Sequence, residues 1–316
     1  MADPCILGGR QAACLISRRQ LPVAGLALAA GCSKVPPRPK ARVFIAKAAH
    51  YNVDLVSLLE RGIEACGLEV HGKRVLLKPN LVEFDSSTAI NTNVAVIAAA
   101  LEVFRKKGAA SVVVAEGPGH RRDTIFLAEE ARYRSEIEKF EELFVDLNRD
   151  DVSSVRPFAT LPEIFLPRTA LAADLIVSLA KMKTHHWAGA TLSMKNLFGL
   201  VPGSVYGWPK NILHRIGITR SILELNRVFR NTFAIVDGIV AMEGNGPIQG
   251  TPKAAGVLVM GSDLPAVDAT CCRMMDISPD SIEYLRLAED LGQTSESQIE
   301  QCGETLASVK TTFRRA

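Results

Sequence analysis

The sequence lacks the short motifs that most often identify a nucleotide site or a hydrolase. No Gly-x-x-x-x-Gly-Lys-[Ser/Thr] or Gly-x-Gly-x-x-Gly element follows an expected strand, so neither standard phosphate-cradling loop supports nucleotide binding. The Gly-x-Ser-x-Gly turn of ordinary α/β hydrolases is also missing. If the protein is an enzyme, proton or hydride transfer of the oxidoreductase or isomerase type is therefore favoured over hydrolysis.

Cysteine is too scattered to build a cluster. Seven cysteines fall at positions 5, 14, 32, 66, 271, 272 and 302, and no two of them are spaced as Cys-x-x-Cys. Zinc ribbons and iron–sulfur clusters therefore lack their ligands, and no disulfide framework is indicated. The adjacent Cys271 and Cys272 lie in an apolar helical pattern and are interpreted as small buried residues. A single bound metal ion or an organic cofactor stays open.

The chain also has little excess charge of either sign. It holds 37 basic and 34 acidic side chains, a net charge of +3. Because residues 1–31 contain three arginines and one aspartate, the excess over the remaining chain falls to +1. Without a basic run there is no electrostatic reason to expect nucleic acid as a partner. With 47% hydrophobic and 22% charged residues, the composition is that of a globular protein.

The first 32 residues differ from the rest and predict an export signal. Arg18 and Arg19 precede an uncharged apolar stretch over 22–31, which leads to Cys32. This order is typical of a signal peptide, and the stretch is too short for a bilayer-spanning helix of about 20 residues. The arginine pair resembles a twin-arginine export signal. A chance arginine pair in an N-terminal extension is the alternative.

The residues before Cys32 also resemble a lipoprotein-processing box, in which the cysteine is lipidated. Ala29 stands where leucine is usual, so this part of the pattern is incomplete. We therefore expect a signal peptide over 1–32 that engages the twin-arginine export machinery. The mature protein would be periplasmic or held at the membrane by a lipid on Cys32, with no other membrane contact.

The remaining chain divides into three parts. Prolines over 33–41 predict an extended tether, and folding is expected to begin near Arg42. Residues 42–292 are expected to form one domain. The polarity of residues 293–316 predicts a loosely attached tail.

Short β-rich runs alternate with helical patterns over 42–292. Strands are expected at 43–46, 75–77, 112–114, 175–177 and 234–236. Between the first two, Leu55, Leu59 and Ile63 recur at the spacing of a helix face. Continuous apolar strands between amphipathic helices predict an α/β fold, with a mainly parallel sheet covered by helices on both faces.

Polar residues follow four of these strands directly. They are Lys78–Asn80, Glu116–Gly119, Lys181–His186, and Asp237–Gly238 with Glu243–Pro247. Taken singly, several of these segments fit ordinary turn chemistry. In open α/β sheets, however, ligands bind beyond the carboxyl ends of the strands, where such segments converge. The coincidence of four polar ends therefore predicts one ligand site at this edge.

Lysine dominates the expected site. Lys195, Asn196 and Lys210, in the stretch between the last two strands, offer donors for an anion and join Lys78, Lys181 and Lys183 at the same edge. For any one lysine, a solvated surface position is the alternative. The cluster as a whole favours a small molecule with a carboxylate or phosphate group. Desolvation can lower the pKa of a lysine enough for proton transfer or imine formation.

We assign candidate roles from residue chemistry. The candidate catalytic residues are Lys183, His185, Lys195, His214 and Asp237. The candidate substrate-binding residues are Lys78, Asn80, Glu116, Gly117, Gly119, Lys181, Asn196, Lys210 and Glu243. His185 is the preferred acid or base, a lysine is its electrostatic or nucleophilic partner, and Asp237 orients one of them.

Two further questions concern the histidines. Side-chain alternation in an extended chain lets only one of His185 and His186 face the cleft. One of them with His214, Asp237 or Glu243 would suit a mononuclear metal site, which stays open.

The polar segments and their order resemble one protein family. The matching segments are Leu77–Asn80, Glu116–Gly119, Asp146–Asn148, Lys181–His185, Met194–Gly199, Pro209–Asn211, His214, Asp237–Val240, Met242–Gly244 and Asp268. From about Arg42 to Gly292 the chain resembles the bacterial and archaeal family called domain of unknown function 362. Members often resemble exported twin-arginine substrates. Some carry a ferredoxin-like segment whose cysteines this chain lacks, so their electron-transfer role is not carried over.

Two functional hypotheses follow. The first is an exported enzyme that acts on a small anionic substrate with lysine and histidine chemistry, with a pre-bound cofactor left open. The second is a non-catalytic, anion-binding or metal-binding envelope lipoprotein. The sequence favours the enzyme, because the polar strand ends combine lysine with histidine, and because no repeated pattern indicates the two similar lobes of a solute-binding protein.

Overall fold

The computed structural model describes residues 39–119 and 123–315. The expected signal peptide over 1–32, the lipidation candidate Cys32 and residues 33–38 of the expected tether lie outside these residues. The first strand begins at Ala41, next to the predicted start of folding at Arg42. Within the described ranges, no helix combines the length and the apolar character that a bilayer crossing needs.

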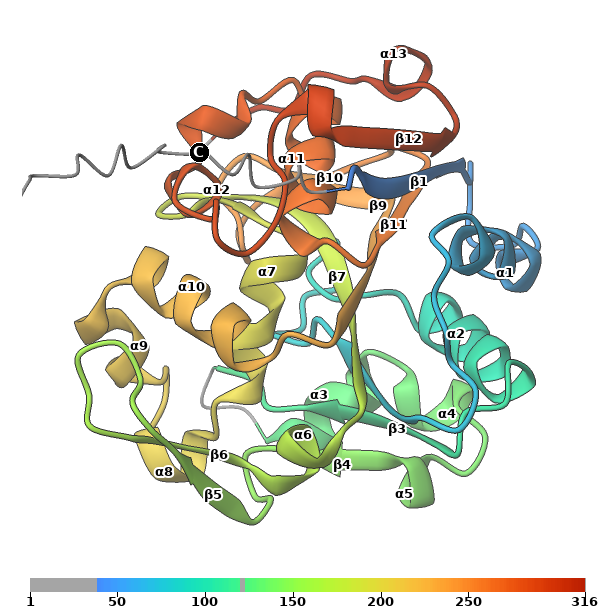
Figure 1. The fold of residues 1–316 in the computed structure, drawn as a ribbon. Helices are drawn as coiled ribbons and strands as arrows, with labels where there is room; N and C mark the ends of the chain where they lie inside the picture. Colours follow the sequence, from blue (N-terminus) through green and yellow to red (C-terminus); the bar gives the residue numbers. More distant parts are fainter. Residues whose placement is uncertain (1–38, 120–122, 316) are drawn as a thin grey trace, which may run out of the picture. The chain divides into compact units, whose positions relative to one another are not determined.

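One sheet of ten strands runs through the described chain, with the order β12-β1-β11-β9-β7-β2-β3-β4 (Figure 1). β8 pairs with β7, and β10 pairs with β9, beside this path. The strands are β1 (Ala41–Lys47), β2 (Arg74–Pro79), β3 (Ser111–Glu116), β4 (Phe144–Asp146), β7 (Leu175–His185), β8 (Gly189–Thr191), β9 (Thr232–Glu243), β10 (Thr251–Lys253), β11 (Val257–Gly261) and β12 (Ile299–Gly303). Every neighbouring pair from β9 to β4 is parallel, whereas β11 is antiparallel to both neighbours. The prediction of an α/β fold with a mainly parallel sheet is confirmed.

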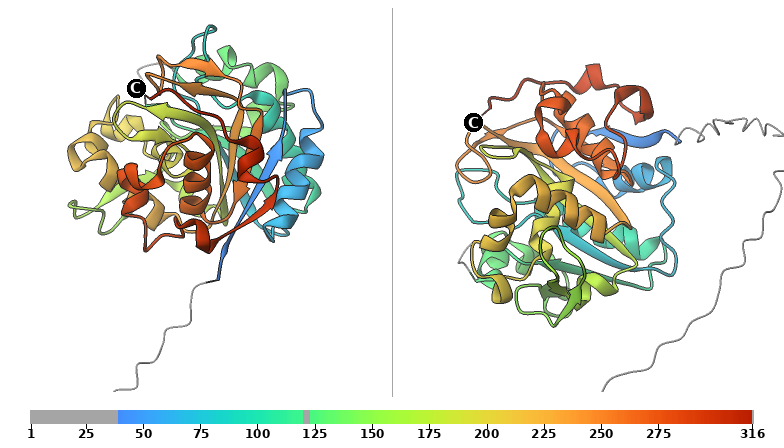
Figure 2. Two further views of the ribbon diagram at one scale, coloured as in Figure 1. Left: turned by 90° about the horizontal axis from the view of Figure 1, so that it is seen from above. Right: turned by 60° about the vertical axis from the view of Figure 1, so that its left-hand side comes forward.

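Helices cover both faces of this sheet (Figure 2). α1 (Leu55–Ala65) and α2 (Val94–Lys106) lie on one face, and α7 (Ser193–Asn196), α10 (Ile218–Val228) and α11 (Leu264–Met274) lie on the other. The other α-helices are α3 (Thr124–Glu130), α4 (Tyr133–Glu136), α5 (Phe140–Leu143), α6 (Arg168–Ala172), α8 (Gly203–Tyr206), α9 (Asn211–Ile216), α12 (Glu283–Arg286) and α13 (Leu306–Val309). β5 (Val152–Val155) and β6 (Ile164–Pro167) form a separate antiparallel pair.

Alternation along the strands builds two cores, one on each face. In β2, Val75 and Leu77 pack with α1 and α2, whereas Leu76 belongs to the core on the opposite face. We call the face covered by α1 and α2 the α1–α2 face. Each of these helices begins at a capping side chain, Asp54 for α1 and Asn93 for α2. Because both faces are covered, the central strands are apolar along most of their length.

β7 and β9 are longer than the sequence indicated. Strands were expected to end at 177 and 236, but β7 continues to His185 and β9 to Glu243. Their polar residues therefore lie on paired strands and not on loops. β2, β3, β7 and β9 run in the same direction, so their polar ends share one edge, as predicted.

The C-terminal segment corrects the expectation of a loosely attached tail over 293–316. β12 pairs in parallel with β1 at the edge of the sheet, and Phe313 is buried. Two contacts of Arg314 with Glu243 fasten the last residues, with its backbone N–H and its Nε 3.0 and 2.9 Å from the carboxylate. The segment is polar because an edge strand exposes one side to water, and charged side chains on such a strand oppose edge-to-edge pairing.

Candidate functional site

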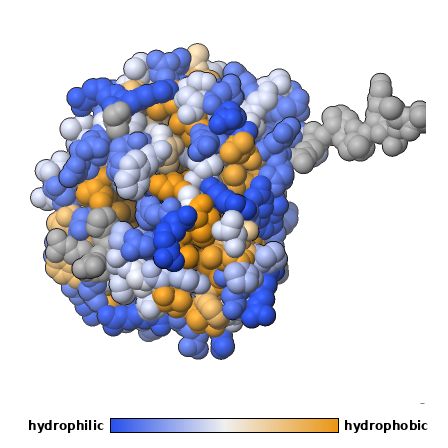
Figure 3. All heavy atoms as spheres, turned by 90° about the vertical axis from the view of Figure 1, so that its left-hand side faces the viewer, coloured by the Kyte–Doolittle hydropathy of each residue, from blue (hydrophilic) through white to orange (hydrophobic). Residues whose placement is uncertain are grey.

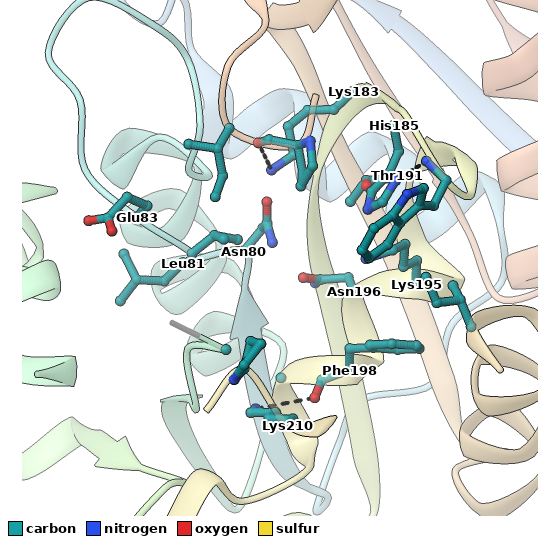
Figure 4. Close-up of a pocket in the computed structure, with 18 of the residues that line it drawn as sticks. Asn80, Leu81, Glu83, Lys183, His185, Thr191, Lys195, Asn196, Phe198 and Lys210 are labelled. Carbon is teal, nitrogen blue, oxygen red and sulfur yellow. Dashed lines mark hydrogen bonds between the residues drawn. The ribbon is translucent and has the colours of Figure 1, made fainter. Parts of the chain in front are cut away.

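A cavity of about 750 Å³ lies beyond the ends of β2, β3 and β7 (Figure 4). Of the predicted catalytic residues, Lys183, His185, Lys195 and His214 line it. Of the predicted binding residues, Lys78, Asn80, Glu116, Gly117, Gly119, Asn196 and Lys210 line it. The other three predicted residues, Lys181, Asp237 and Glu243, are not among its lining residues.

Lys78 and Glu116 form a buried ion pair in the wall of the cavity. The Lys78 Nζ lies 2.6 Å from a carboxylate oxygen of Glu116, and both side chains are 1% exposed. Asn196 accepts a further hydrogen bond from the same Nζ at 3.2 Å. A Cβ on Gly199 would lie 2.0 Å from Glu116 Oε1, so only glycine admits the pair at this point. Burial lowers the pKa of Lys78, and the attraction of Glu116 opposes this effect.

Lys183 is fully buried and has no carboxylate partner in the described part of the chain. Its Nζ donates to the backbone carbonyls of Ile90 at 2.9 Å and Pro247 at 3.3 Å. Burial, reinforced by the positive charge of Lys195, lowers the pKa of Lys183 well below its usual value. Two carbonyl acceptors match the two N–H groups of a neutral amine, which leaves the nitrogen lone pair unused.

Lys210 has the same arrangement on the other side of the cavity. Its Nζ donates to the carbonyls of Gly117 and Phe198. Burial lowers the pKa of Lys210 to about 7, against the opposing effect of Glu116. Both the protonated and the neutral form of Lys210 are therefore accessible near neutral pH.

Lys195 is the cavity lysine without a hydrogen-bond partner among the described residues. Its Nζ lies 4.9 Å from the centre of the Phe198 ring, within the range of a cation–π contact. Burial, followed by the charge of Lys78, lowers its pKa to about 8. Lys195 is therefore mainly an ammonium ion at neutral pH, with its N–H donors available to a ligand.

The position of Lys195 depends on a buried carboxylate of α11. Asp268 accepts hydrogen bonds from the backbone N–H groups of Ser193 and Met194, at 2.8 and 3.1 Å, and thereby holds the first turn of α7. Burial raises the pKa of Asp268 to about 7. Asp268 acts on the cavity only through the backbone that it fixes.

His185 is a neutral imidazole with a fixed tautomer. Its Nδ1 accepts the backbone N–H groups of Trp187 at 3.0 Å and Ala188 at 3.2 Å, so the ring proton is on Nε2. Burial, followed by the charge of Lys195, lowers its pKa to about 2. The ring therefore suits a hydrogen-bond donor at neutral pH; of the two predicted roles, acid or base, this arrangement favours the proton-donating one.

The prediction that only one of His185 and His186 faces the cleft is wrong, because both line the cavity. Their rings stack with centres 4.8 Å apart. β7 ends at His185 and the chain turns, so strand alternation no longer applies to His186. His186 Nδ1 lies 2.7 Å from the carbonyl oxygen of Gly246.

Two buried polar atoms of the cavity lining have no partner among the described residues. They are Asn80 Oδ1 and the hydroxyl oxygen of Thr191. Buried polar groups are almost always hydrogen-bonded, and each exception needs an explanation. A bound ligand that completes these hydrogen bonds provides one here.

Comparison with known proteins identifies the family. The model of the family described as domain of unknown function (DUF362) matches residues 75–273, more than half of the chain. The chain belongs to the DUF362 family. This confirms the resemblance inferred from the polar segments.

Two other proteins are similar to this DUF362 protein. The thylakoid-associated protein sll1697 of Synechocystis is 33% identical over 131 residues, which are 40% of this chain and 40% of that protein. The chain thus matches less than half the length of this relative. The lactate racemase apoprotein from Thermoanaerobacterium thermosaccharolyticum superposes with a TM-score of 0.48 and 14% identity, over 76% of this chain and 58% of that one.

Lys181 and Asp237 of the DUF362 protein pair with each other outside the cavity. Lys181 Nζ lies 2.8 Å from Asp237 Oδ2, and the hydroxyl of Tyr51 donates to Asp237 Oδ1 at 3.0 Å. Both residues share strand parity with Leu179 and Ile235, which pack on the α1–α2 face. This corrects the prediction that Asp237 orients a cavity lysine or histidine.

Glu243 is also occupied elsewhere. Its carboxylate binds Arg314 at 2.9 Å and lies 3.7 Å from Lys253 Nζ. In the described parts of this DUF362 protein, no group of three or more histidine, cysteine, aspartate or glutamate side chains is placed to hold a metal ion. Asp237 and Glu243 also do not line the cavity that His185, His186 and His214 line, so neither carboxylate is placed beside these histidines.

Sequence reasoning missed several residues of the site. His186, Trp187, Thr191 and Phe198 line the cavity without having been assigned to it. Trp187 carried a usable signal, because it is one of only two tryptophans and directly follows a polar strand end. Thr191 could not be identified from the sequence, because its position at the cavity depends on the pairing of β8 with β7.

Proposed function

We propose that this DUF362 protein is an enzyme that binds a small carboxylate- or phosphate-bearing molecule in the cavity and moves a proton on it. The observation that carries the proposal is the convergence of four lysines, of which only Lys78 is paired with a carboxylate in the described chain. A partly enclosed cavity with unbalanced positive charge attracts an anion. A lysine with a depressed pKa supplies a base at neutral pH.

In this proposal, three side chains of the cavity have separate roles. Lys195 binds the anionic group, because its ammonium has no other hydrogen-bond partner. Lys183 takes a proton from the carbon next to a carbonyl or carboxyl group, using its unused lone pair, and later returns it. His185 donates its Nε2–H to the substrate oxygen on which negative charge develops. The volume of the cavity also leaves room for a pre-bound cofactor.

Lys195→Met is expected to weaken the binding of the anion by about 10- to 100-fold, because a charge-assisted hydrogen bond is lost. Lys183→Met should retain binding and lose proton exchange. The measurement is proton NMR in D₂O with a panel of carboxylates and phosphate esters, in which loss of a C–H signal reports exchange. Lys47→Met, at an exposed lysine outside the cavity, is the matched control.

The same experiment tests the alternative function. Binding that depends on Lys195 without exchange of any C–H group would favour a non-catalytic anion-binding protein. Exchange that survives in Lys183→Met would contradict the assigned base. Native mass spectrometry of the protein from its own envelope would show whether an organic group or a metal ion accompanies it.

We also propose that the protein is exported by the twin-arginine route and anchored by a lipid at Cys32. The support is the order of Arg18, Arg19, the apolar stretch and Cys32. Replacing both arginines with lysine is expected to leave unprocessed protein in the cytoplasm. Cys32→Ala is expected to release the protein from the membrane fraction or to block its maturation. Unchanged fractionation of both variants would rule out the export proposal.

A further inference from the structure

We propose that the ligand is amphiphilic: its anionic group lies in the cavity, and an apolar chain or ring leaves past Trp187 into a neighbouring groove. This inference rests on the proposed function, because it takes the anion-binding cavity as its starting point. It narrows the substrate class from small anions in general to carboxylates or phosphate esters with an apolar portion.

A second, more open groove of about 950 Å³ lies beside the cavity. Trp187, Pro209, His214 and Ile218 line both spaces, so the two share a wall. An apolar portion of the ligand that extends past these shared residues would therefore enter the groove.

The two spaces differ in chemistry. The cavity contains the lysines, whereas the groove adds Leu223 and Leu287 to the shared apolar residues. Its charged side chains, Arg220 and Glu283, are of opposite sign, and Glu283 accepts a hydrogen bond from Thr219 at 2.5 Å. Figure 3, which faces the side that carries α9 and α10, shows apolar residues gathered at the centre of a largely hydrophilic surface.

Trp187 is placed to cover an apolar ligand. Its side chain is 69% exposed, so the fold itself gains little from burying it. Its ring packs edge-on against His214, with centres 5.7 Å apart, and its backbone N–H is held by His185. A large, exposed and positioned aromatic ring is a suitable surface for an apolar chain or a second ring.

The groove holds exposed apolar side chains of its own. Six large hydrophobic residues of the described chain are exposed, and two of them, Trp187 and Leu287, line it. Together with the shared wall, this favours the apolar part of the cavity's own ligand as the occupant. A second copy of the chain is an alternative that the experiment detects.

The test uses straight-chain carboxylates from acetate to octanoate, with dissociation constants measured by calorimetry on the full chain. Complete burial would strengthen binding roughly fourfold per methylene, so a groove open on one side should give about twofold. Octanoate, which has six more methylenes than acetate, is then expected to bind about 60-fold more tightly. Octanoate, and not acetate, should also protect Trp187 from quenching by acrylamide, a neutral quencher that does not compete for the lysines.

Leu287→Ala should weaken octanoate about threefold and leave acetate unchanged, because Leu287 lines only the groove. Phe126→Ala, at an exposed residue that lines neither space, should change neither acid. If acetate binds through Lys195 and affinity does not rise with chain length, this inference fails and the proposed function stands. If no acid binds, both fail. If the protection of Trp187 from acrylamide rises with protein concentration and does not depend on octanoate, the groove binds a second copy of the chain and the inference is overturned.

Discussion

Glu116→Gln is expected to lower the free energy of unfolding by about 3–5 kcal/mol, because it leaves the ammonium of Lys78 buried without its counter-charge. The carboxylate of Glu116 also accepts the backbone N–H groups of Leu81 and Gly117, at 3.1 and 2.8 Å. An amide cannot accept from all of these donors at once. The loss therefore combines an unpaired charge with an unsatisfied donor.

Urea unfolding of the purified variant measures this effect, and the deficit should depend on pH. The unpaired Lys78 has a folded-state pKa further below its unfolded value, so the unfolded state binds more protons and the stability of the variant recovers as the pH rises. Adding Lys78→Met should restore part of the loss, since both charges are then gone. Glu136→Gln, in an exposed ion pair, is the control and should change stability little. A deficit below 1 kcal/mol in Glu116→Gln at neutral pH would contradict the buried pair.

Asp237→Asn is expected to cost a similar 3–5 kcal/mol and to leave ligand affinity unchanged in the fraction that remains folded. The carboxylate accepts hydrogen bonds from Lys181, from Tyr51 and from the backbone N–H groups of Asn93 and Ile239. An asparagine amide would point one N–H₂ group at these donors. Because none of these contacts reaches the cavity lining, the loss should appear in stability alone.

Chemical unfolding and calorimetry on the same Asp237→Asn sample separate the two roles. Lys195→Met provides the opposite pattern, with lost affinity and nearly unchanged stability. If Asp237→Asn is fully stable but binds the ligand weakly, the original prediction of Asp237 as a catalytic residue would be supported instead.

Much of the sheet could be predicted from the sequence, because its central strands are buried on both faces and therefore continuously apolar. The runs at 75–77, 112–114, 175–177 and 234–236 all became strands of one sheet. The extensions of β7 and β9 could not be predicted in this way. Their polar residues are buried through ion pairs and backbone hydrogen bonds, which a hydrophobic pattern does not register.

The site was predictable as an edge of the sheet and less so residue by residue. Lys181 and Asp237 each stand two positions after a residue of the α1–α2 core and pair with each other on that face. Lys183, two positions further along β7 and past a shift in its register with β9, lines the cavity instead. The alternation of side chains along a strand could be used here only if the strands were known to continue past 177 and 236. At His186 the same rule gave a wrong prediction, because β7 ends at His185 and alternation no longer applies. The sequence indicated Lys183, Lys195 and Lys210 at this edge, but only the fold shows that they lack carboxylate partners among the described residues.

The pairing of β1 with β11 sets how much of the chain this fold requires. The matched family range ends at residue 273 and starts at 75, but β1 and β12 lie outside it and cover one side of β11. A fragment trimmed to 75–273 would leave β11, whose residues are all buried, as an open hydrophobic edge. Such an edge recruits other strands, so this fragment should aggregate, whereas a chain starting at Pro39 and retaining its last strand should not. The folded unit of this protein is therefore longer at both ends than the segment by which its family is identified.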